Sequence, residues 1–177
     1  VHRSLKFAYD RKKGYFGIKV NGDEFPHTVS HLDKFICVKG DGSYKVSQVE
    51  EKAYGGPDVL YLAPASKERL MLVAYTLKGI GYIKKFAFGG AILNKEYSCV
   101  PAKAKILYFG EYFEGPLYIK YAPVPKQKIS AQFLDTALLR TKSAKANGNQ
   151  LSIKKIKSVS GNKPRGWDQL NATQIRL

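Results

Sequence analysis

Basic side chains cluster near the end of the sequence, in a pattern suited to binding phosphate groups. The segment from Arg140 to Lys157 holds six lysines or arginines and no acidic residue. Its small residues Ala144, Ala146 and Gly148 would let the backbone approach a phosphate closely. A solvated loop is the competing interpretation. The candidate phosphate-binding residues in this segment are Arg140, Lys142, Lys145, Lys154, Lys155 and Lys157.

Further basic candidates lie at turns in the first half of the chain and on one predicted strand. Lys84 and Lys85 sit inside the alternating segment 81–86. Adjacent side chains on a strand face opposite ways, so only one of these two lysines is expected to face outward. A solvated lysine that keeps an edge strand from aggregating is the alternative. The remaining candidates are Arg11, Lys12, Lys13, Lys39 and Lys45.

Residue types that catalysis or metal binding would need are present but are not arranged for it. His27 and His31 have the spacing of a helical metal pair, yet they flank a predicted strand, so a satisfied or exposed histidine is expected instead. Gly79 and Gly81 lack the rest of a nucleotide-binding fingerprint, and they lie between strands rather than before a helix. We therefore predict no catalytic residue, no cofactor-binding residue and no metal ligand.

The charge balance points to a polyanionic partner. The 177 residues include 30 lysines and arginines against 14 acidic residues, a formal net charge of +16. Residues 126–177 alone contribute +9. No apolar run reaches the roughly 20 residues of a membrane span, and no basic amphipathic helix is apparent, so we expect no membrane partner. Residues 1–4 lack the apolar stretch of a signal peptide, which favours a cytoplasmic location.

Alternating apolar residues and frequent turn signals predict an all-β chain. Helical periodicity is nearly absent, and Asp41-Gly42 supplies the positive φ that a tight hairpin needs. Cys37 and Cys99 fall on predicted strands or their edges, where we expect reduced, half-buried thiols. The clearest predicted strands are 15–20, 27–30, 34–38 and 43–49, followed by a hairpin over 69–88 with its turn at 78–81.

The hairpin pattern recurs after roughly forty residues, which is typical of a blade-like repeat. The spacing of turn signals divides residues 1–160 into four units, of which the third is short and could share a strand with a neighbour. Residues 161–177 are expected to form a basic linker or tail, or to begin a further strand that stays incomplete. The four units are 1–55, 56–93, 94–125 and 126–160.

Several segments, in order along the chain, resemble the C-terminal domain of the DNA-cleaving subunit of bacterial type IIA DNA topoisomerases, most closely topoisomerase IV. The resemblance implies a β-pinwheel, a propeller-like fold of about four blades, whose basic rim binds and bends duplex DNA. The matching segments are DRKKGYFG (10–17), GDEF (22–25), GDGSYKV (40–46), GYIKKF (81–86), NKEY (94–97), KILYF (105–109) and GNQLSIKKIK (148–157).

The resemblance also implies an accessory role in an ATP-dependent isomerase rather than an enzyme in its own right. The catalytic tyrosine of the family follows an arginine in the N-terminal domain of the DNA-cleaving subunit, and no Arg-Tyr pair occurs in this chain. Mg²⁺ and ATP are expected only in the holoenzyme, where a separate ATPase subunit hydrolyses ATP. The expected partners are double-stranded DNA, the N-terminal domain of the DNA-cleaving subunit, and the ATPase subunit, in the bacterial cytoplasm at the nucleoid.

Two alternative functions remain at this level. The first is the C-terminal DNA-wrapping domain of gyrase, whose family carries a Gln-Arg-Arg-Gly-Gly-Lys-Gly box for wrapping DNA with a fixed hand. The comparable segment here, Lys142 to Gly148, keeps little of that box beyond its last glycine and its charge, which favours a topoisomerase IV type. The second is an RNA-binding β-barrel, which would need exposed aromatic side chains for stacking.

Overall fold

Short antiparallel strands build nearly all of the structure. The computed structural model describes residues 4–177, which form 17 strands in four sheets and two short 3-10 helices. The predicted all-β class is confirmed. The described chain divides into two compact units: the first contains the residues up to Arg69 together with Phe88–Val100, and the second contains Leu70–Ala87 and Pro101–Leu177.

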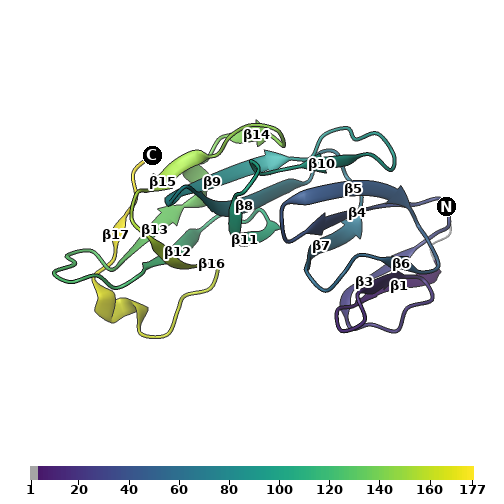
Figure 1. The fold of residues 1–177 in the computed structure, drawn as a ribbon, viewed down its shortest axis with the longest axis horizontal. Coiled ribbons are helices and arrows are strands. Elements are labelled where there is room, and N and C mark those ends of the chain that lie inside the picture. The colour runs from purple at the N-terminus through teal and green to yellow at the C-terminus, as the bar shows by residue number, and fades with distance from the viewer. Residues whose placement is uncertain (1–3) are drawn as a thin grey trace. The chain divides into compact units, whose positions relative to one another are not determined.

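The first unit consists of two sheets that share an aromatic core. The phenylalanine rings of Phe7 and Phe16, from one sheet, lie 5.2 and 5.1 Å from the ring of Phe35 in the other. Within the second sheet, β5 (Ser43–Gln48) lies between β4 (Lys34–Lys39) and β10 (Glu96–Ser98) (Figure 1). The first sheet has the order β3 (Glu24–Val29), β1 (Leu5–Asp10), β2 (Tyr15–Gly17), β6 (Ala53–Tyr54), and the second β10 (Glu96–Ser98), β5 (Ser43–Gln48), β4 (Lys34–Lys39), β7 (Val59–Pro64).

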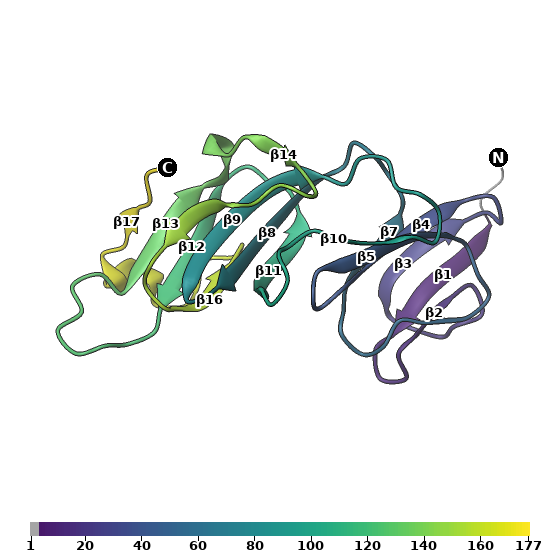
Figure 2. The ribbon, with the colours of Figure 1, turned by 45° about the horizontal axis from the view of Figure 1, so that its top comes forward.

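The second unit also consists of two sheets, which pack through aliphatic side chains. Leu72 and Ile83 of the third sheet join Leu117, Ile119 and Leu134 of the fourth in one buried cluster. Figure 2 shows the strands of the third sheet side by side. That sheet has the order β11 (Lys105–Glu111), β8 (Leu70–Leu77), β9 (Ile80–Ala87), β14 (Thr141–Ser143), with β15 (Asn149–Ser152) also paired to β9, and the fourth has the order β16 (Ile156–Ser160), β12 (Pro116–Tyr121), β13 (Ala131–Asp135), β17 (Thr173–Gln174).

The longest hairpin, β8 with β9, follows directly from its turn residues. Lys78 and Gly79 both have positive φ angles, 52° and 80°, which is the conformation of a two-residue hairpin turn with the twist of the flanking strands. The strands pair in full register from Leu70 with Ala87 to Leu77 with Ile80. The predicted hairpin is confirmed, with a turn two residues shorter than expected.

The sheets do not coincide with the four ranges expected from the repeat. Strands β4 and β5 fall inside 1–55 but belong to the second sheet, and β10, from 94–125, completes that sheet by pairing with β5. Likewise β14 and β15, from 126–160, pair with β9 of the third sheet. The second and third sheets therefore each take a strand from a later range of the chain, which local turn signals do not reveal.

Two local expectations need correction. The strand expected over 15–20 ends at Gly17, because the next two amides donate hydrogen bonds to the carbonyls of Glu50 and Glu51 instead of continuing the ladder. Cys37 and Cys99 form no disulfide bond, and both side chains are buried rather than half-buried.

The last residues belong to the fourth sheet. The 3-10 helix η2 (Trp167–Leu170) places the ring of Trp167 edge-on to Tyr118, with 4.9 Å between ring centroids. Strand β17 then pairs in parallel with β13, and Ile175 enters the aliphatic core. Within residues 161–177 the structure thus places a two-residue strand, Thr173–Gln174, in the fourth sheet.

Candidate nucleic-acid interface

Positive charge is distributed very unevenly between the two units. The second unit has 17 lysines and arginines and 4 acidic residues, a formal net charge of +13. The first unit has 13 basic and 10 acidic residues, a net charge of +3. A polyanion is therefore attracted mainly to the second unit.

The loop between β14 and β15 displays part of the predicted basic cluster. Lys145 is exposed at the tip of this loop, and Arg140 is exposed just before β14. The half-buried Lys142 donates a hydrogen bond of 2.8 Å from Nζ to the carbonyl of Asn147, which ties one end of the loop to the other. The loop and the segment that leads into it thus carry three cations within six residues of sequence.

A second group of cations lines a hollow of about 390 Å³ next to β12 and β16. The amide of Ala122 donates to the carbonyl of Lys155 at 2.9 Å, and this bond joins the 122–129 connection to the 153–155 turn. Lys154 Nζ donates to the carbonyl of Ile129 at 3.3 Å and lies 5.5 Å from the centroid of the Tyr121 ring. The lysines of the hollow are Lys126, Lys128, Lys154 and Lys155, and no acidic side chain lines it.

Two of these lysines were missed by the sequence analysis. Lys126 and Lys128 lie far from Lys154 and Lys155 in sequence. The one signal available was the absence of acidic residues around both segments. Lys157, which was predicted, is exposed on β16.

Arg11, a predicted DNA-binding residue of the first unit, is already engaged by protein groups. Its Nε and Nη2 lie 2.9 Å from the two carboxylate oxygens of Glu24, and Nη1 and Nη2 also donate to the carbonyls of Pro57 and Val59. The hydrogen bond to Glu24 raises the pKa of Arg11, and the same bond lowers the pKa of Glu24. Arg11 therefore fastens a turn to its neighbours, while Lys12 and Lys13 beside it are exposed.

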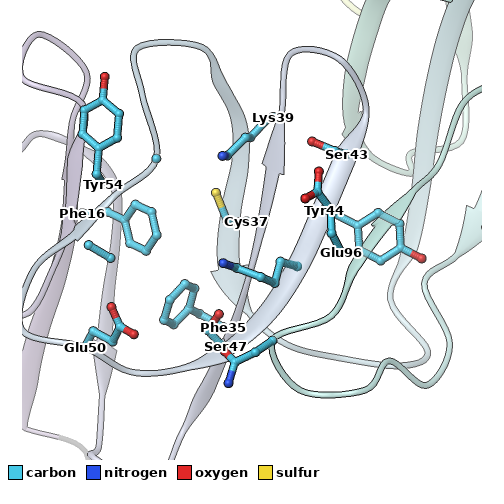
Figure 3. Close-up of a pocket in the computed structure, with 14 residues that line it drawn as sticks. Phe16, Phe35, Cys37, Lys39, Ser43, Tyr44, Ser47, Glu50, Tyr54 and Glu96 are labelled. Carbon is cyan, nitrogen blue, oxygen red and sulfur yellow. The ribbon is translucent and has the colours of Figure 1, made fainter. Parts of the chain in front are cut away.

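Lys39 and Lys45 line a cavity of about 120 Å³ between the two sheets of the first unit. Lys39 and Cys37 face Phe16 and Tyr54 across it (Figure 3). Burial raises the pKa of the Cys37 thiol to about 11, against a smaller lowering by the two lysines, so the thiol is protonated at neutral pH. The carboxylates of Glu50 and Glu96 also line the cavity, and this mixture of charges is a weaker anion site than the hollow of the second unit.

Lys84 and Lys85 take very different positions on β9. Lys84 is 1% exposed, and its Nζ donates to the carbonyls of Ala144 and Ala146 at 2.8 and 3.0 Å. This side chain does not reach the surface, so the expectation that it contacts a phosphate is corrected. Lys85 is half-buried, with Nζ 4.1 Å from the centroid of the Tyr112 ring.

The histidines are not gathered into a metal-binding cluster in the part of the chain that the structure describes. Between residues 4 and 177, no three His, Cys, Asp or Glu side chains gather in a way that could hold a metal ion. His27 Nε2 hydrogen-bonds the carbonyl of Leu62 at 3.2 Å, and His31 is exposed; His2 lies outside the described residues. In the same described range, neither helix is long and apolar enough to cross a membrane.

The chain is similar to a known protein family and to a solved structure. The family model described as the topoisomerase C-terminal domain of Bacteroidota matches residues 6–163. Among solved structures, the C-terminal domain of DNA topoisomerase IV is similar, with a TM-score of 0.52 and 11% sequence identity over 90% of this chain. The present chain spans 62% of that chain. At this identity the likeness concerns the fold, which is that of a β-pinwheel. Proteins with curated descriptions gave no match.

Proposed function

Because the chain belongs to the family of topoisomerase C-terminal domains of Bacteroidota, we propose that it binds duplex DNA as the C-terminal part of the DNA-cleaving subunit of a topoisomerase IV. The observation that carries this proposal is the concentration of charge: the second unit holds +13 of the total of +16. Two groups of its cations lie in the loop around Lys145 and in the hollow around Lys155.

Binding is proposed to be independent of base sequence. The two helices among residues 4–177 are 3-10 helices of three and four residues, too short to serve as a recognition helix in a major groove. Lysines that neutralise phosphates release condensed counterions, and this release supplies most of the affinity of non-specific complexes. The domain would hold one duplex segment and present it for passage through another.

The chemistry of strand passage is proposed to reside elsewhere in the holoenzyme. The N-terminal domain of the DNA-cleaving subunit would cut DNA with Mg²⁺, and the ATPase subunit would hydrolyse ATP, so no cofactor is assigned to this chain. The proposed location is the bacterial cytoplasm, at the nucleoid. An RNA-binding β-barrel is not favoured, because the four sheets formed by the described residues are open rather than closed.

Titration of a fluorescent duplex at several salt concentrations tests the proposal. The logarithm of the association constant should fall linearly with the logarithm of salt concentration, with a slope of about −0.9 for each phosphate neutralised. A flat salt response would contradict DNA binding by this surface.

Matched charge reversals locate the surface. The double variant Lys145→Glu/Lys155→Glu changes two exposed cations of the second unit, and Lys12→Glu/Lys13→Glu changes two of the first. Both lower the net charge equally. We expect the second-unit variant to bind about tenfold more weakly or worse, with a shallower salt slope, and the first-unit variant to change much less. Melting temperatures should stay close to the parent, because exposed substitutions usually alter stability by within about 0.5 kcal/mol. An equal loss in both variants would remove the assignment to the second unit.

A further inference from the structure

The buried ammonium of Lys84 is the most unusual charged group in the second unit. The side chain is 1% exposed and lies on β9 with its Nζ 4.9 Å from the centroid of the Phe86 ring. A charged group is costly to bury unless it is paired or hydrogen-bonded. The hydrogen bonds that offset this cost therefore indicate the role of the lysine.

The ammonium of Lys84 is hydrogen-bonded to two backbone carbonyls of one loop. Nζ donates to the carbonyls of Ala144, at 2.8 Å, and Ala146, at 3.0 Å. Hydrogen bonds from an ionised donor are stronger than neutral ones. Two carbonyls that flank a single residue are thus held against the sheet by one cation, and the residue between them, Lys145, is exposed.

Other contacts anchor the same loop from both ends. The hydroxyl of Tyr75, on β8, accepts a hydrogen bond of 2.9 Å from the amide of Gly148. The amide of Ala146 donates to the carbonyl of Ser143 at 3.1 Å, and the side chain of Ala144 is buried. On either side of the loop, β14 and β15 pair with β9, the strand that carries Lys84. The loop is therefore fastened at several points to the hairpin beneath it.

We propose that Lys84 is a positioning residue for DNA binding: its buried ammonium fixes the Ala144–Gly148 loop in the conformation that presents Lys145 to a phosphate. This inference rests on the proposed function. A binding surface that is ordered before the ligand arrives loses less entropy on binding. Affinity for DNA then depends on a lysine that does not itself touch DNA.

A double-mutant cycle on the whole chain tests the inference. The four proteins are the parent, Lys84→Met, Lys145→Ala and the double variant, with affinity measured on a fluorescent duplex at one low salt concentration. Methionine keeps an unbranched side chain but removes the charge. We expect Lys84→Met to weaken binding by about threefold or more in the parent and by less than about 1.5-fold when Lys145 is already alanine, because coupled residues give non-additive effects.

Controls separate positioning from loss of charge and from loss of stability. Lys105→Met removes one exposed cation at the start of β11 and should have little effect on affinity. Hydrogen exchange of the amides of residues 144–148 should accelerate in Lys84→Met while the amides of β12 and β13 keep their protection. If Lys84→Met does not fold, Tyr75→Phe tests the inference instead. It removes the hydrogen bond to the amide of Gly148, and so loosens the same loop, without changing any charge. Tyr75→Phe should weaken binding in the parent and not in Lys145→Ala.

The outcomes are distinguishable. Parent-like affinity of Lys84→Met, or an equal loss with and without Lys145, would overturn the positioning role while leaving DNA binding intact. Parent-like affinity of Lys145→Ala would also overturn it, since the loop would then contribute no contact. Absence of salt-dependent DNA binding by the parent protein would instead overturn the proposed function itself.

Discussion

Arg11 and Glu24 form a two-pronged ion pair, with Nε 2.9 Å from Oε2 and Nη2 2.9 Å from Oε1. The guanidinium approaches the carboxylate with two parallel N–H groups, the geometry that gives arginine its advantage over lysine in such pairs. The pair joins the turn after β1 to the first residue of β3. Arg11, which the sequence analysis predicted to contact DNA, thus stabilises the first sheet through its ion pair with Glu24.

The ion pair should make stability depend on pH at the acidic end. Arg11 lowers the pKa of Glu24 in the folded state, so the unfolded chain binds a proton at Glu24 more readily. The stabilisation is present above the unfolded pKa of about 4.3 and is lost as pH falls through the lower, folded pKa.

We expect Glu24→Gln to lower the free energy of unfolding at pH 7 by up to about 1 kcal/mol, because the pair is partly exposed. The difference from the parent should shrink as pH falls from about 5 to 3. Urea denaturation followed by circular dichroism at each pH measures it. Glu51→Gln, which removes a more exposed pair with Lys19, serves as the control and should change less. A constant difference across this pH range would contradict the argument.

Both thiols should be unreactive in the folded protein. Burial raises the pKa of Cys37 to about 11, and Cys99 is 1% exposed with Sγ 3.3 Å from the carbonyl of Gly42. The thiolate is the reactive form, and little of it is present at Cys37 at pH 8. Alkylation by iodoacetamide, followed by mass spectrometry, should label neither residue in native buffer and both in guanidinium at about 6 M, which unfolds most domains. Rapid labelling of either thiol under native conditions would show that its strand opens.

The segment after residue 160 should contribute to the stability of the second unit. Trp167 is 7% exposed and packs edge-on against Tyr118, and replacing a buried tryptophan by alanine typically costs about 3–5 kcal/mol. We expect Trp167→Ala to lower the free energy of unfolding by about that amount in urea denaturation followed by circular dichroism. Arg165→Ala, an exposed change two residues earlier, is the matched control. A change of less than about 1 kcal/mol would mean that the segment is not part of the fourth sheet in solution.

The choice between topoisomerase IV and gyrase can be settled by linking number. The Lys142–Gly148 segment has no arginine and one glycine, so we expect the domain to hold DNA without wrapping it with a fixed hand. Nicked circular DNA is ligated with and without the purified domain and then deproteinised. An unchanged distribution of topoisomers, with binding shown in parallel by gel shift, is the expected result. A shift toward positive linking number that grows with protein concentration would identify a wrapping domain of the gyrase type.

How far the sequence predicts the structure depends on whether a feature is local. The β8–β9 hairpin was predicted because alternation and the Lys78-Gly79 turn lie within twenty residues. Alternation also indicated that one of Lys84 and Lys85 would face inward. It did not indicate which, because Ile83, on the opposite face from Lys84, is also buried, against the fourth sheet. Both faces of β9 are covered, so the usual contrast between an apolar and a polar face is missing.

The parts that could not be predicted depend on contacts between distant segments. Strands β10, β14 and β15 have three or four residues each, too few for a periodic pattern. The hollow brings Lys126 and Lys128 beside Lys154 and Lys155 through a hydrogen bond between Ala122 and Lys155, which no local signal announces. A search for charge clusters along the sequence finds only half of such a site.

Strand β10 is synthesised after the other strands of its sheet, which has a consequence during translation on the ribosome. Strands β4, β5 and β7 exist once Pro64 has been made, but the open edge of β5 waits for Glu96–Ser98. At about 5–20 residues per second, translation leaves that edge unpaired for on the order of a few seconds. An unpaired edge strand is a template for pairing with another chain. The nascent polypeptide thus passes through an interval of vulnerability to misassembly that the finished protein no longer displays, and slower translation between codons 65 and 98 would lengthen it.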